Sequence, residues 1–365
     1  MPDGANIKPL TALRFFAALW VVLFHYWPKL DVAMTPALVE KGYLGVELFF
    51  TLSGFILCHV YLTAFGEGRF RYGDFLWNRL ARVYPLHLAT LAGMIALGVV
   101  AGAVGLSVDS GVLRWDSLPA NILMIHAWGF APAAAFNHPS WSISAEWFAY
   151  LTFPAFGFIA WRMRNRPWLL ASGVLVFMVA FYPAFEALAG FPLTQATIDW
   201  GMLRIVPCFA LGCAMHALWK SGAVKSLAAG AVGAAFSGAG MLIAAAAGAP
   251  DVVAIIGFGG LILCLAGMAQ NGSTFASQPA LTYLGEISYS TYMICVPWKI
   301  IFVNAAAKVL NLPGEKLPLG LWIIFIVALV PLSAASYHLI EKPARNRMKL
   351  WADSWRARRD AAATA

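Results

Sequence analysis

Charged residues are scarce in this sequence. Only 12% of its 365 residues are Asp, Glu, Lys or Arg, whereas 61% are hydrophobic and the mean hydropathy is +0.73. No polar stretch long enough to form a domain interrupts the apolar runs that recur between residues 10 and 341. A soluble protein carries far more charge, so this composition excludes a water-soluble fold and predicts one membrane domain.

The sequence also lacks the spacing patterns of metal and disulfide sites. Its histidines are scattered, and its five cysteines lie within apolar stretches without zinc-type or disulfide-type spacing. We therefore expect no metal and no redox cofactor. The first apolar segment, 10–27, is not followed by a small-residue cleavage site, which predicts that it stays as a helix and is not a signal peptide. The cysteines are Cys58, Cys208, Cys213, Cys264 and Cys295.

Long apolar runs predict an all-α, polytopic membrane helix bundle. At about 20 residues per crossing, the sequence holds roughly ten transmembrane helices and no internal repeat. A further apolar stretch, 118–130, is short enough to be re-entrant or interfacial, so it is not counted as a span. The predicted helices are 9–28, 42–64, 80–105, 141–161, 167–190, 200–219, 224–248, 252–269, 281–303 and 318–341.

The net charge of +8 does not point to nucleic acid, because the basic residues lie between the predicted spans. Most of these residues fall on one side of the bundle, the side that holds both ends of the chain. The positive-inside rule therefore predicts that both termini are cytoplasmic. We expect a transmembrane domain over residues 1–345 and a basic, tryptophan-containing cytoplasmic tail over 346–365 that contacts anionic lipid headgroups.

Two ionisable residues lie inside the first predicted helix. Such residues are costly in a membrane and suggest a function unless they are paired structurally. Arg14 and His25 are eleven residues apart, which places them on nearly the same helix face and roughly 16 Å apart along the axis. We predict that both point into one cavity at two depths, with His25 near the outer surface. The alternative for His25 is a hydrogen-bonded core residue without a catalytic role.

A third ionisable residue, Glu146, is predicted near the outer start of the helix 141–161. Ser142 lies on the same face of that helix, one turn earlier. At the depth of His25, the Glu146 carboxylate would fix the tautomer of the imidazole and raise its basicity. The alternative is a glutamate in the first helical turn that is favoured by the helix dipole alone.

Four arginines cluster between the second and third predicted helices, on the side assigned to the cytoplasm. Arg79 and Arg82 are helical neighbours, and Arg69 and Arg71 precede them. Arginine side chains suit phosphate recognition, so the cluster could bind a nucleotide-bearing donor such as coenzyme A. Membrane topology alone would also place arginines on this side, and without other information it is the simpler explanation.

Motifs spread over nearly the whole chain resemble those of the acyltransferase-3 family, the bacterial membrane O-acyltransferases that modify sugars and related hydroxyl compounds. Each motif is weak by itself, but all of them occur in the order that the family shows. They are Leu13-Arg14 with ten residues before His25, Gly45 to Phe55 (GVELFFTLSGF), Arg79 to Pro85 (RLARVYP), Trp141 to Glu146 (WSISAE), Leu284 to Ser290 (LGEISYS) and Ile340 to Pro343 (IEKP).

The resemblance implies a protein of the bacterial cytoplasmic (inner) membrane that moves an acyl group from cytoplasmic acyl-coenzyme A to an extracytoplasmic hydroxyl. Acetyl-coenzyme A is the leading candidate for the donor. His25 matches the essential histidine, Arg14 its partner arginine, and Arg79 and Arg82 the pair that contacts the donor, to which we add Arg71. The chain resembles the family members without a C-terminal hydrolase-like domain. The expected acceptors are a glycan, a glycolipid or a small glycoside.

The mechanism expected from these residues places the pantetheine arm of the donor in an internal channel, held in part by Arg14, with His25 as general base on the acceptor hydroxyl. An acyl-histidine intermediate is also open. Ser142, Trp141 and Ser53 are candidates for stabilising the oxyanion. The rival class is a transporter or flippase of a glycan or lipid-linked substrate, because buried charges could also line a translocation path. A third class is a non-catalytic membrane partner.

Overall fold

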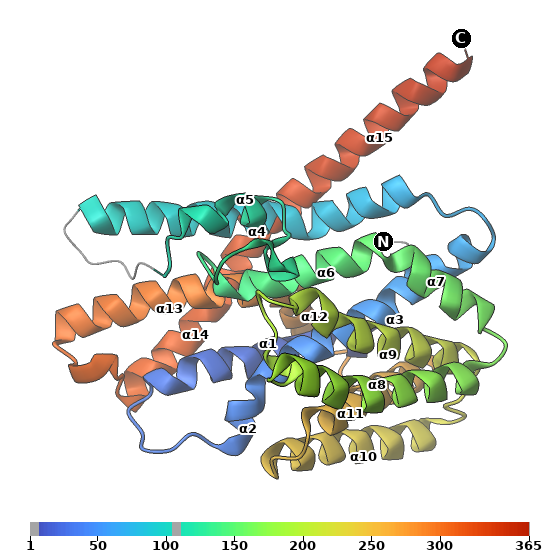
Figure 1. Ribbon diagram of the computed structural model, residues 1–365, viewed down its shortest axis with the longest axis horizontal. Coiled ribbons are helices and arrows are strands. Elements are labelled where there is room, and N and C mark those ends of the chain that lie inside the picture. The colour runs from blue at the N-terminus through green and yellow to red at the C-terminus, as the bar shows by residue number, and fades with distance from the viewer. Residues whose placement is uncertain (1–6, 104–110, 365) are drawn as a thin grey trace.

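The computed structural model describes residues 7–103 and 111–364, and the regular structure in this part of the chain is helical (Figure 1). The prediction of an all-α protein is confirmed. The longer helices are α1 (Lys8–Tyr26), α3 (Gly45–Gly66), α4 (Tyr72–Ala103), α6 (Trp141–Leu151), α7 (Phe153–Arg162), α8 (Pro167–Ala189), α9 (Gly201–Lys220), α10 (Leu227–Ala246), α11 (Asp251–Gln270), α12 (Pro279–Glu286), α13 (Ser288–Leu310), α14 (Leu319–Ser336) and α15 (Lys342–Thr364).

Nine helical segments among the described residues are long and apolar enough to cross a membrane. The helices α6 and α7 are bent by 54° at a short break between them. They form a tenth crossing if the bent pair counts as one span. Pro154 accounts for the break, since proline has no N–H to donate to the carbonyl four residues earlier. Beside the break, the hydroxyl of Tyr72 donates to the carbonyl of Leu151 (2.8 Å). The prediction of about ten transmembrane helices is confirmed.

Some predicted boundaries differ from the structure. The helix predicted at 80–105 begins at Tyr72, because the polar residues before position 80 continue the helix ahead of its apolar run. Positions 104 and 105 lie outside the described residues. The helix predicted at 318–341 continues beyond α14 through a π turn, Tyr337–Glu341, into α15. The predicted division at residue 345 therefore falls inside α15.

The apolar stretch 118–130 does not form a span. It contains the short helix α5 (Leu118–Ile122) and a π turn, His126–Phe130, and neither is long enough to cross a membrane. The positive φ of Met124 and of Gly129 turns the chain twice within this stretch. Leaving this stretch out of the predicted spans agrees with the structure.

The helices define two ends of the bundle. We call the end at which α1 begins the α15 end, because α15 also starts there, and the opposite end, where α1 stops after His25, the His25 end. Most helices run side by side along the long axis in Figure 1, and α15 (red) leaves them obliquely. The connection between α3 and α4 lies at the α15 end, whereas α6 starts at the His25 end.

Glycines allow the central helices to approach each other closely. A Cβ at Gly212 of α9 would come 2.0 Å from the carbonyl oxygen of Thr51 on α3. A Cβ at Gly285 of α12 would come 1.8 Å from the carbonyl oxygen of Thr11 on α1. Only glycine fits at these contacts, as is common where membrane helices pack. The contacts hold α3 against α9 and α12 against α1, and so fix the helices that carry the family-like motifs.

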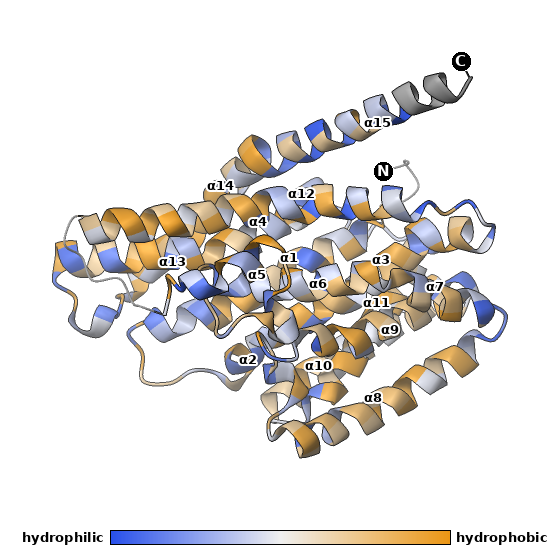
Figure 2. Ribbon diagram, turned by 45° about the horizontal axis from the view of Figure 1, so that its top comes forward, coloured by the Kyte–Doolittle hydropathy of each residue, from blue (hydrophilic) through white to orange (hydrophobic). Residues whose placement is uncertain are grey.

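The surface around the bundle is apolar. Figure 2 shows hydrophobic residues along α8, α10 and α13, and many hydrophilic residues in α15. Large side chains on the outer faces, such as Val176 (70% exposed) and Phe236 (81% exposed), have no protein cover. A continuous exposed apolar surface is what lipid contact requires, so the fold is that of a multi-pass membrane protein.

Candidate active site

A cavity of about 930 Å³ lies within the bundle. Residues of α1, α3, α4, α6, α12, α13, the π turn before α15 and α15 line it, together with the connection between α3 and α4 at the α15 end. Basic side chains outnumber acidic ones on its walls, so the cavity attracts anions. The basic residues are Arg14, Arg69, Arg71, Arg79, Arg82, Arg345 and Lys349, and the acidic residues are Asp74, Glu146 and Glu286.

Arg14 lies on the wall that α1 contributes to this cavity. Its guanidinium is 6.0 Å from the ring centroid of Phe49 on α3. Arg14 forms no ion pair with any described residue, although the charges of Arg82 and Glu146 act on it. An arginine inside a membrane protein is costly without an ion-paired anion, and a ligand in the cavity could supply one.

Arg79 is also without a carboxylate partner in the described part of the chain. Its guanidinium lies over the rings of Tyr61 (5.7 Å) and Tyr150 (5.9 Å), and its buried Nε makes no hydrogen bond. The two rings hold the guanidinium by cation–π contacts and leave its donors to a ligand. The geometry therefore suits Arg79 to bind an anion in the cavity.

Arg82 differs from Arg79, although the two are one helical turn apart. It forms an ion pair with Glu341, which is 1% exposed. The second oxygen of Glu341 accepts a hydrogen bond from Ser290 (2.9 Å), and Arg345 lies 3.5 Å from the first. Residues from RLARVYP, LGEISYS and IEKP thus meet at one carboxylate. Arg82 ties α4 to the π turn before α15.

Arg71 lies where the cavity meets the α15 end. Its side chain is 54% exposed, and its Nε is 3.1 Å from the Asp74 carboxylate. Arg69 is paired with Glu67 in the same connection. Of the three arginines predicted to bind the donor, all line the cavity, but Arg71 and Arg82 are already paired with carboxylates and Arg79 is not.

Glu146 faces the same cavity and not His25. Its Oε1 accepts a hydrogen bond from Ser53 Oγ (2.5 Å), and its charge acts on Arg14. No hydrogen bond or ion pair joins Glu146 to His25 in the described structure, and His25 does not line the cavity. The reason is depth: Glu146 is five residues into α6, whereas His25 is one residue from the end of α1, a difference of roughly 6 Å.

His25 has two other titratable neighbours. The groups that act on it electrostatically are His138, just before α6, and Lys299 on α13. Tyr26 holds this end of α1 against α13, because its hydroxyl donates to the carbonyl of Cys295 (2.8 Å), one turn before Lys299. The amide of Asn137 donates to the carbonyl of Met293 (2.8 Å) and so fixes the segment of His138 on the same helix.

The deep end of the cavity lies next to this histidine pair. Ser142 and Tyr292 both line the cavity, and their hydroxyl oxygens are 2.9 Å apart. Tyr292 also donates to the carbonyl of Pro139 (3.0 Å), the residue after His138. The hydroxyls of Ser142 and Tyr292 therefore stand between the cavity and the neighbourhood of His25.

Trp141 packs against a buried ion pair outside the cavity. Its ring lies 4.5 Å from the guanidinium of Arg204, which forms an ion pair with Glu47 (2.5 Å). Both charged side chains are almost fully buried, and Arg204 also donates to the carbonyl of Ala196 (3.0 Å). This pair links α3 to α9. Trp141 does not line the cavity, so the structure does not bring it together with Ser142 and Ser53.

Sequence reasoning singled out neither Lys299 nor Arg204. Each is a charged residue inside a predicted span, at 281–303 and 200–219, which is the same signal that drew attention to Arg14. Nor did sequence reasoning single out His138, which precedes the predicted helix 141–161. Among the described residues, no group of three or more His, Cys, Asp or Glu side chains is placed to hold a metal ion.

The family model of an acyltransferase domain matches residues 7–338 of this chain. The chain belongs to the acyltransferase-3 family. A relative, Acyltransferase MdmB of Streptomyces mycarofaciens, is 30% identical over 323 residues, which cover 80% of this chain and 79% of MdmB. The identity and coverage support the same assignment. This acyltransferase-3 protein is thus a membrane acyltransferase by family and by fold.

Two further relatives of this acyltransferase-3 protein match less fully. Protein 2 in the picA locus of Rhizobium radiobacter is 32% identical over 183 residues, 47% of this chain and 92% of that protein. The protein named Putative peptidoglycan O-acetyltransferase YrhL, from Bacillus subtilis, is 22% identical over 378 residues, 93% of this chain and 55% of YrhL. No solved structure matches the chain.

Proposed function

We propose that this protein transfers an acyl group, with acetyl as the leading candidate, from cytoplasmic acyl-coenzyme A to a hydroxyl of an extracytoplasmic glycan, glycolipid or small glycoside. The observation that carries the proposal is the basic cavity. It presents Arg14 and Arg79 without carboxylate partners among the described residues, and it ends at Ser142 and Tyr292, beside the neighbourhood of His25. Its volume is that of a small-molecule site.

The donor enters this cavity from the α15 end. The excess of Lys and Arg between spans at that end supports a cytoplasmic orientation, and acyl-coenzyme A is a cytoplasmic compound. Arg79, Arg345 and Lys349 supply donors for its diphosphate, for which arginine forks are well suited. The pantetheine arm then extends past Arg14 toward Ser142.

Acyl transfer takes place at the deep end of the cavity. His25 accepts the proton of the acceptor hydroxyl as its oxygen attacks the thioester carbonyl, and a carbon–oxygen bond forms. The hydroxyl of Ser142 turns from Tyr292 to donate to the oxyanion of the tetrahedral intermediate, while Tyr292 stays bonded to the carbonyl of Pro139. The intermediate collapses with cleavage of the carbon–sulfur bond, and the imidazolium returns its proton to the coenzyme A thiolate. Ser53 is bonded to Glu146 and serves to place that carboxylate near Arg14.

The acceptor reaches His25 from the opposite end. The name of YrhL, a relative at 22% identity, refers to acetylation of peptidoglycan, which supports a glycan-type hydroxyl as the acceptor class here. MdmB is named as an acyltransferase without an acceptor, so the choice among a glycan, a glycolipid and a small glycoside rests on chemistry alone.

The test is transfer of label from radiolabelled acetyl-coenzyme A by the full-length protein in liposomes. We expect the wild type to release free coenzyme A and to acylate membrane glycans or water, and His25→Ala to lose this activity by roughly 10²- to 10⁴-fold, the usual contribution of a general base. His338→Ala is the matched control, because His338 is exposed and does not line the cavity.

Two outcomes would contradict the proposal. Full activity of His25→Ala, with the same melting temperature as the wild type, would remove His25 as the base. A wild type that binds no acyl-coenzyme A but moves a glycan across the liposome membrane would replace acyl transfer by transport.

A further inference from the structure

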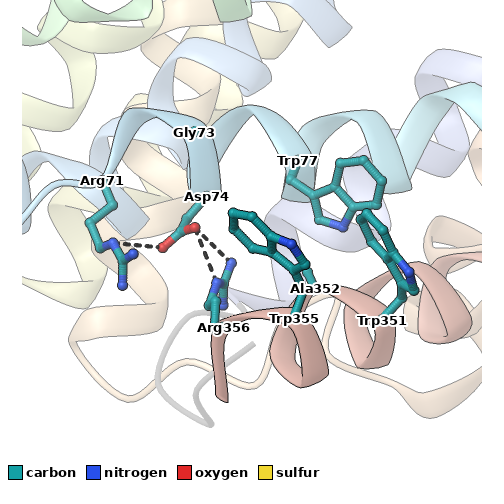
Figure 3. Close-up of a pocket in the computed structure, with 8 residues that line it drawn as sticks. All are labelled: Arg71, Gly73, Asp74, Trp77, Trp351, Ala352, Trp355 and Arg356. Atoms are coloured by element: carbon teal, nitrogen blue, oxygen red, sulfur yellow. Dashed lines mark hydrogen bonds and ion pairs between the residues drawn. The ribbon is translucent and has the colours of Figure 1, made fainter. Parts of the chain in front are cut away.

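A second hollow, of about 500 Å³, adjoins the mouth of the basic cavity. It lies between the first turns of α4 and the middle of α15 (Figure 3). Arg71 and Asp74 line both spaces, so the two are adjacent. The residues around the hollow are Arg71, Gly73, Asp74, Trp77, Trp351, Ala352, Trp355 and Arg356.

Three tryptophan rings form most of this hollow. Trp77 is fixed, because its indole N–H donates to the carbonyl of Met348 (2.9 Å) and its ring packs on that of Trp351 with centroids 5.0 Å apart. Trp351 and Trp355 are 58% and 54% exposed. Figure 3 shows the Trp355 indole between Asp74 and the Trp77–Trp351 pair. Aromatic surface presented in this way is suited to stacking against a flat ring.

The charges around the hollow favour a neutral ring over a phosphate. Asp74 is paired with Arg71 (3.1 Å) and with Arg356 (2.9 Å), and Arg356 also contacts Asp353 (3.0 Å). These arginines are therefore already balanced by carboxylates. A carboxylate oxygen such as that of Asp74 can accept a hydrogen bond from an amino group on a base, whereas it would repel a phosphate.

Helix α15, which carries Trp351 and Trp355, also presents basic side chains to the neighbouring basic cavity. Arg345 and Lys349 of α15 line the basic cavity, and Lys349 precedes Trp355 by six residues, roughly 9 Å along the helix. This is the kind of separation that a ribose imposes between a diphosphate and its base. Lys349 and Trp355 thus present, in order, partners for the diphosphate and for the base of one extended nucleotide.

We propose that Trp77, Trp351 and Trp355 form a stacking site for the adenine base of the donor nucleotide, with Asp74 accepting a hydrogen bond from the adenine amino group. The inference rests on the proposed use of acyl-coenzyme A. It makes α15 part of the donor site. The competing explanation for the exposed tryptophans is anchoring of α15 in the lipid interface.

The experiment compares two donors that share a thioester and differ in the nucleotide. The full-length protein in liposomes is assayed with acetyl-coenzyme A and with acetyl-pantetheine, which lacks the base and the diphosphate. We expect Trp355→Ala to raise KM for acetyl-coenzyme A about tenfold, the usual loss of one stacking contact, and to leave KM for acetyl-pantetheine unchanged. Trp355→Phe should restore most of the affinity because it keeps an aromatic face.

The control variant is Trp168→Ala on α8. Trp168 has a similar exposure (65%) and lines neither the hollow nor the basic cavity. Equal losses with both donors, or equal losses in Trp355→Ala and Trp168→Ala, would overturn the stacking site in favour of lipid anchoring. If Trp355→Ala lowers the melting temperature, binding of 3′,5′-ADP to Trp355→Phe and to Asp74→Asn, measured by calorimetry, decides the matter: unchanged affinity in both variants overturns the site.

The same assays distinguish failure of the stacking site from failure of the proposed acyl transfer. A wild type that uses acetyl-coenzyme A and acetyl-pantetheine with the same KM refutes the stacking site and leaves acyl transfer at His25 intact. A wild type that transfers acetyl from neither donor refutes both proposals.

Discussion

The α15 end and the His25 end of this protein differ in how their charged side chains are paired. At the α15 end, a basic cavity holds Arg14 and Arg79 without carboxylate partners among the described residues. At the His25 end, Lys29 and Lys41 are paired with carboxylates, and two polar side chains near His25 bond to backbone: Tyr26 to the carbonyl of Cys295, and Asn137 to that of Met293. Under the proposed function, charge therefore holds the donor, whereas packing and a few polar groups place the acceptor.

This difference has a kinetic consequence. Residues that bind the donor by charge act on its affinity, whereas residues that place or activate the acceptor act on the chemical step or on acceptor affinity. Variants at the two ends should therefore change different constants. The α15 end is itself divided, because some of its arginines hold the fold and others remain open to a ligand.

The largest effect that we expect at the α15 end is on stability. Arg82→Ala leaves the Glu341 carboxylate buried without its main partner, and breaking a buried ion pair costs about 3–5 kcal/mol. Thermal melting in detergent should show a marked loss of stability. The double variant Arg82→Ala with Glu341→Gln should recover much of it, because the carboxylate charge is also gone. A stable single variant with a raised donor KM would instead make Arg82 a donor ligand.

Arg79→Ala should behave differently, although it is only one turn away. Arg79 has no carboxylate to leave unpaired in the described structure, so the fold should keep its melting temperature. The loss of a charged hydrogen bond to the donor, about 1.5–3 kcal/mol, should raise KM for acetyl-coenzyme A by roughly 10- to 100-fold. Arg79→Lys should recover part of the affinity. An unchanged KM in Arg79→Ala would show that the diphosphate binds elsewhere.

Sequence reasoning predicted the fold class and the approximate spans, but not the pairing of the charged residues. Arg14 lines the cavity, whereas His25, predicted to share it, and Trp141 do not. Hydropathy and helical periodicity are local properties, and they suffice to place Arg14 and Arg79 on their helices. The ion pair that separates Arg82 from Arg79 involves Glu341, 259 residues further along the chain. No local pattern reports a contact at that distance in the sequence.

The partner of His25 could not be predicted for a related reason. The expected pairing with Glu146 assumed that both residues lie at one depth, but a few residues along a helix change the depth by several ångströms. The three residues before α6, 138–140, form a 3₁₀ turn that carries His138, whose charge acts on His25, whereas Glu146 faces the cavity. Lys299 lies in the predicted helix 281–303, and hydropathy alone does not show which neighbour such a charge faces.

Lys299 provides the finest test of the difference between the two ends. It is carried by α13, its charge acts on His25, and it forms no ion pair with any described residue, whereas Lys29 and Lys41 at the same end are paired with carboxylates. If this charge assists the acceptor, Lys299→Met should lower kcat/KM for the acceptor by about tenfold, near the lower limit for a charged hydrogen bond, and leave KM for acetyl-coenzyme A unchanged.

Lys299→Arg keeps the charge and should retain most of the activity, whereas Lys308→Met serves as a control in the last turn of α13. The two kinetic constants separate the two ends directly. KM for the donor is measured at a saturating acceptor concentration, and kcat/KM for the acceptor is measured at a saturating donor concentration. A rise in the donor KM of Lys299→Met would mean that charge recognition of the donor extends through Ser142 and Tyr292 to His25. In that case the cavity and the histidine would form one continuous donor site, and the acceptor would have to approach His25 from another side.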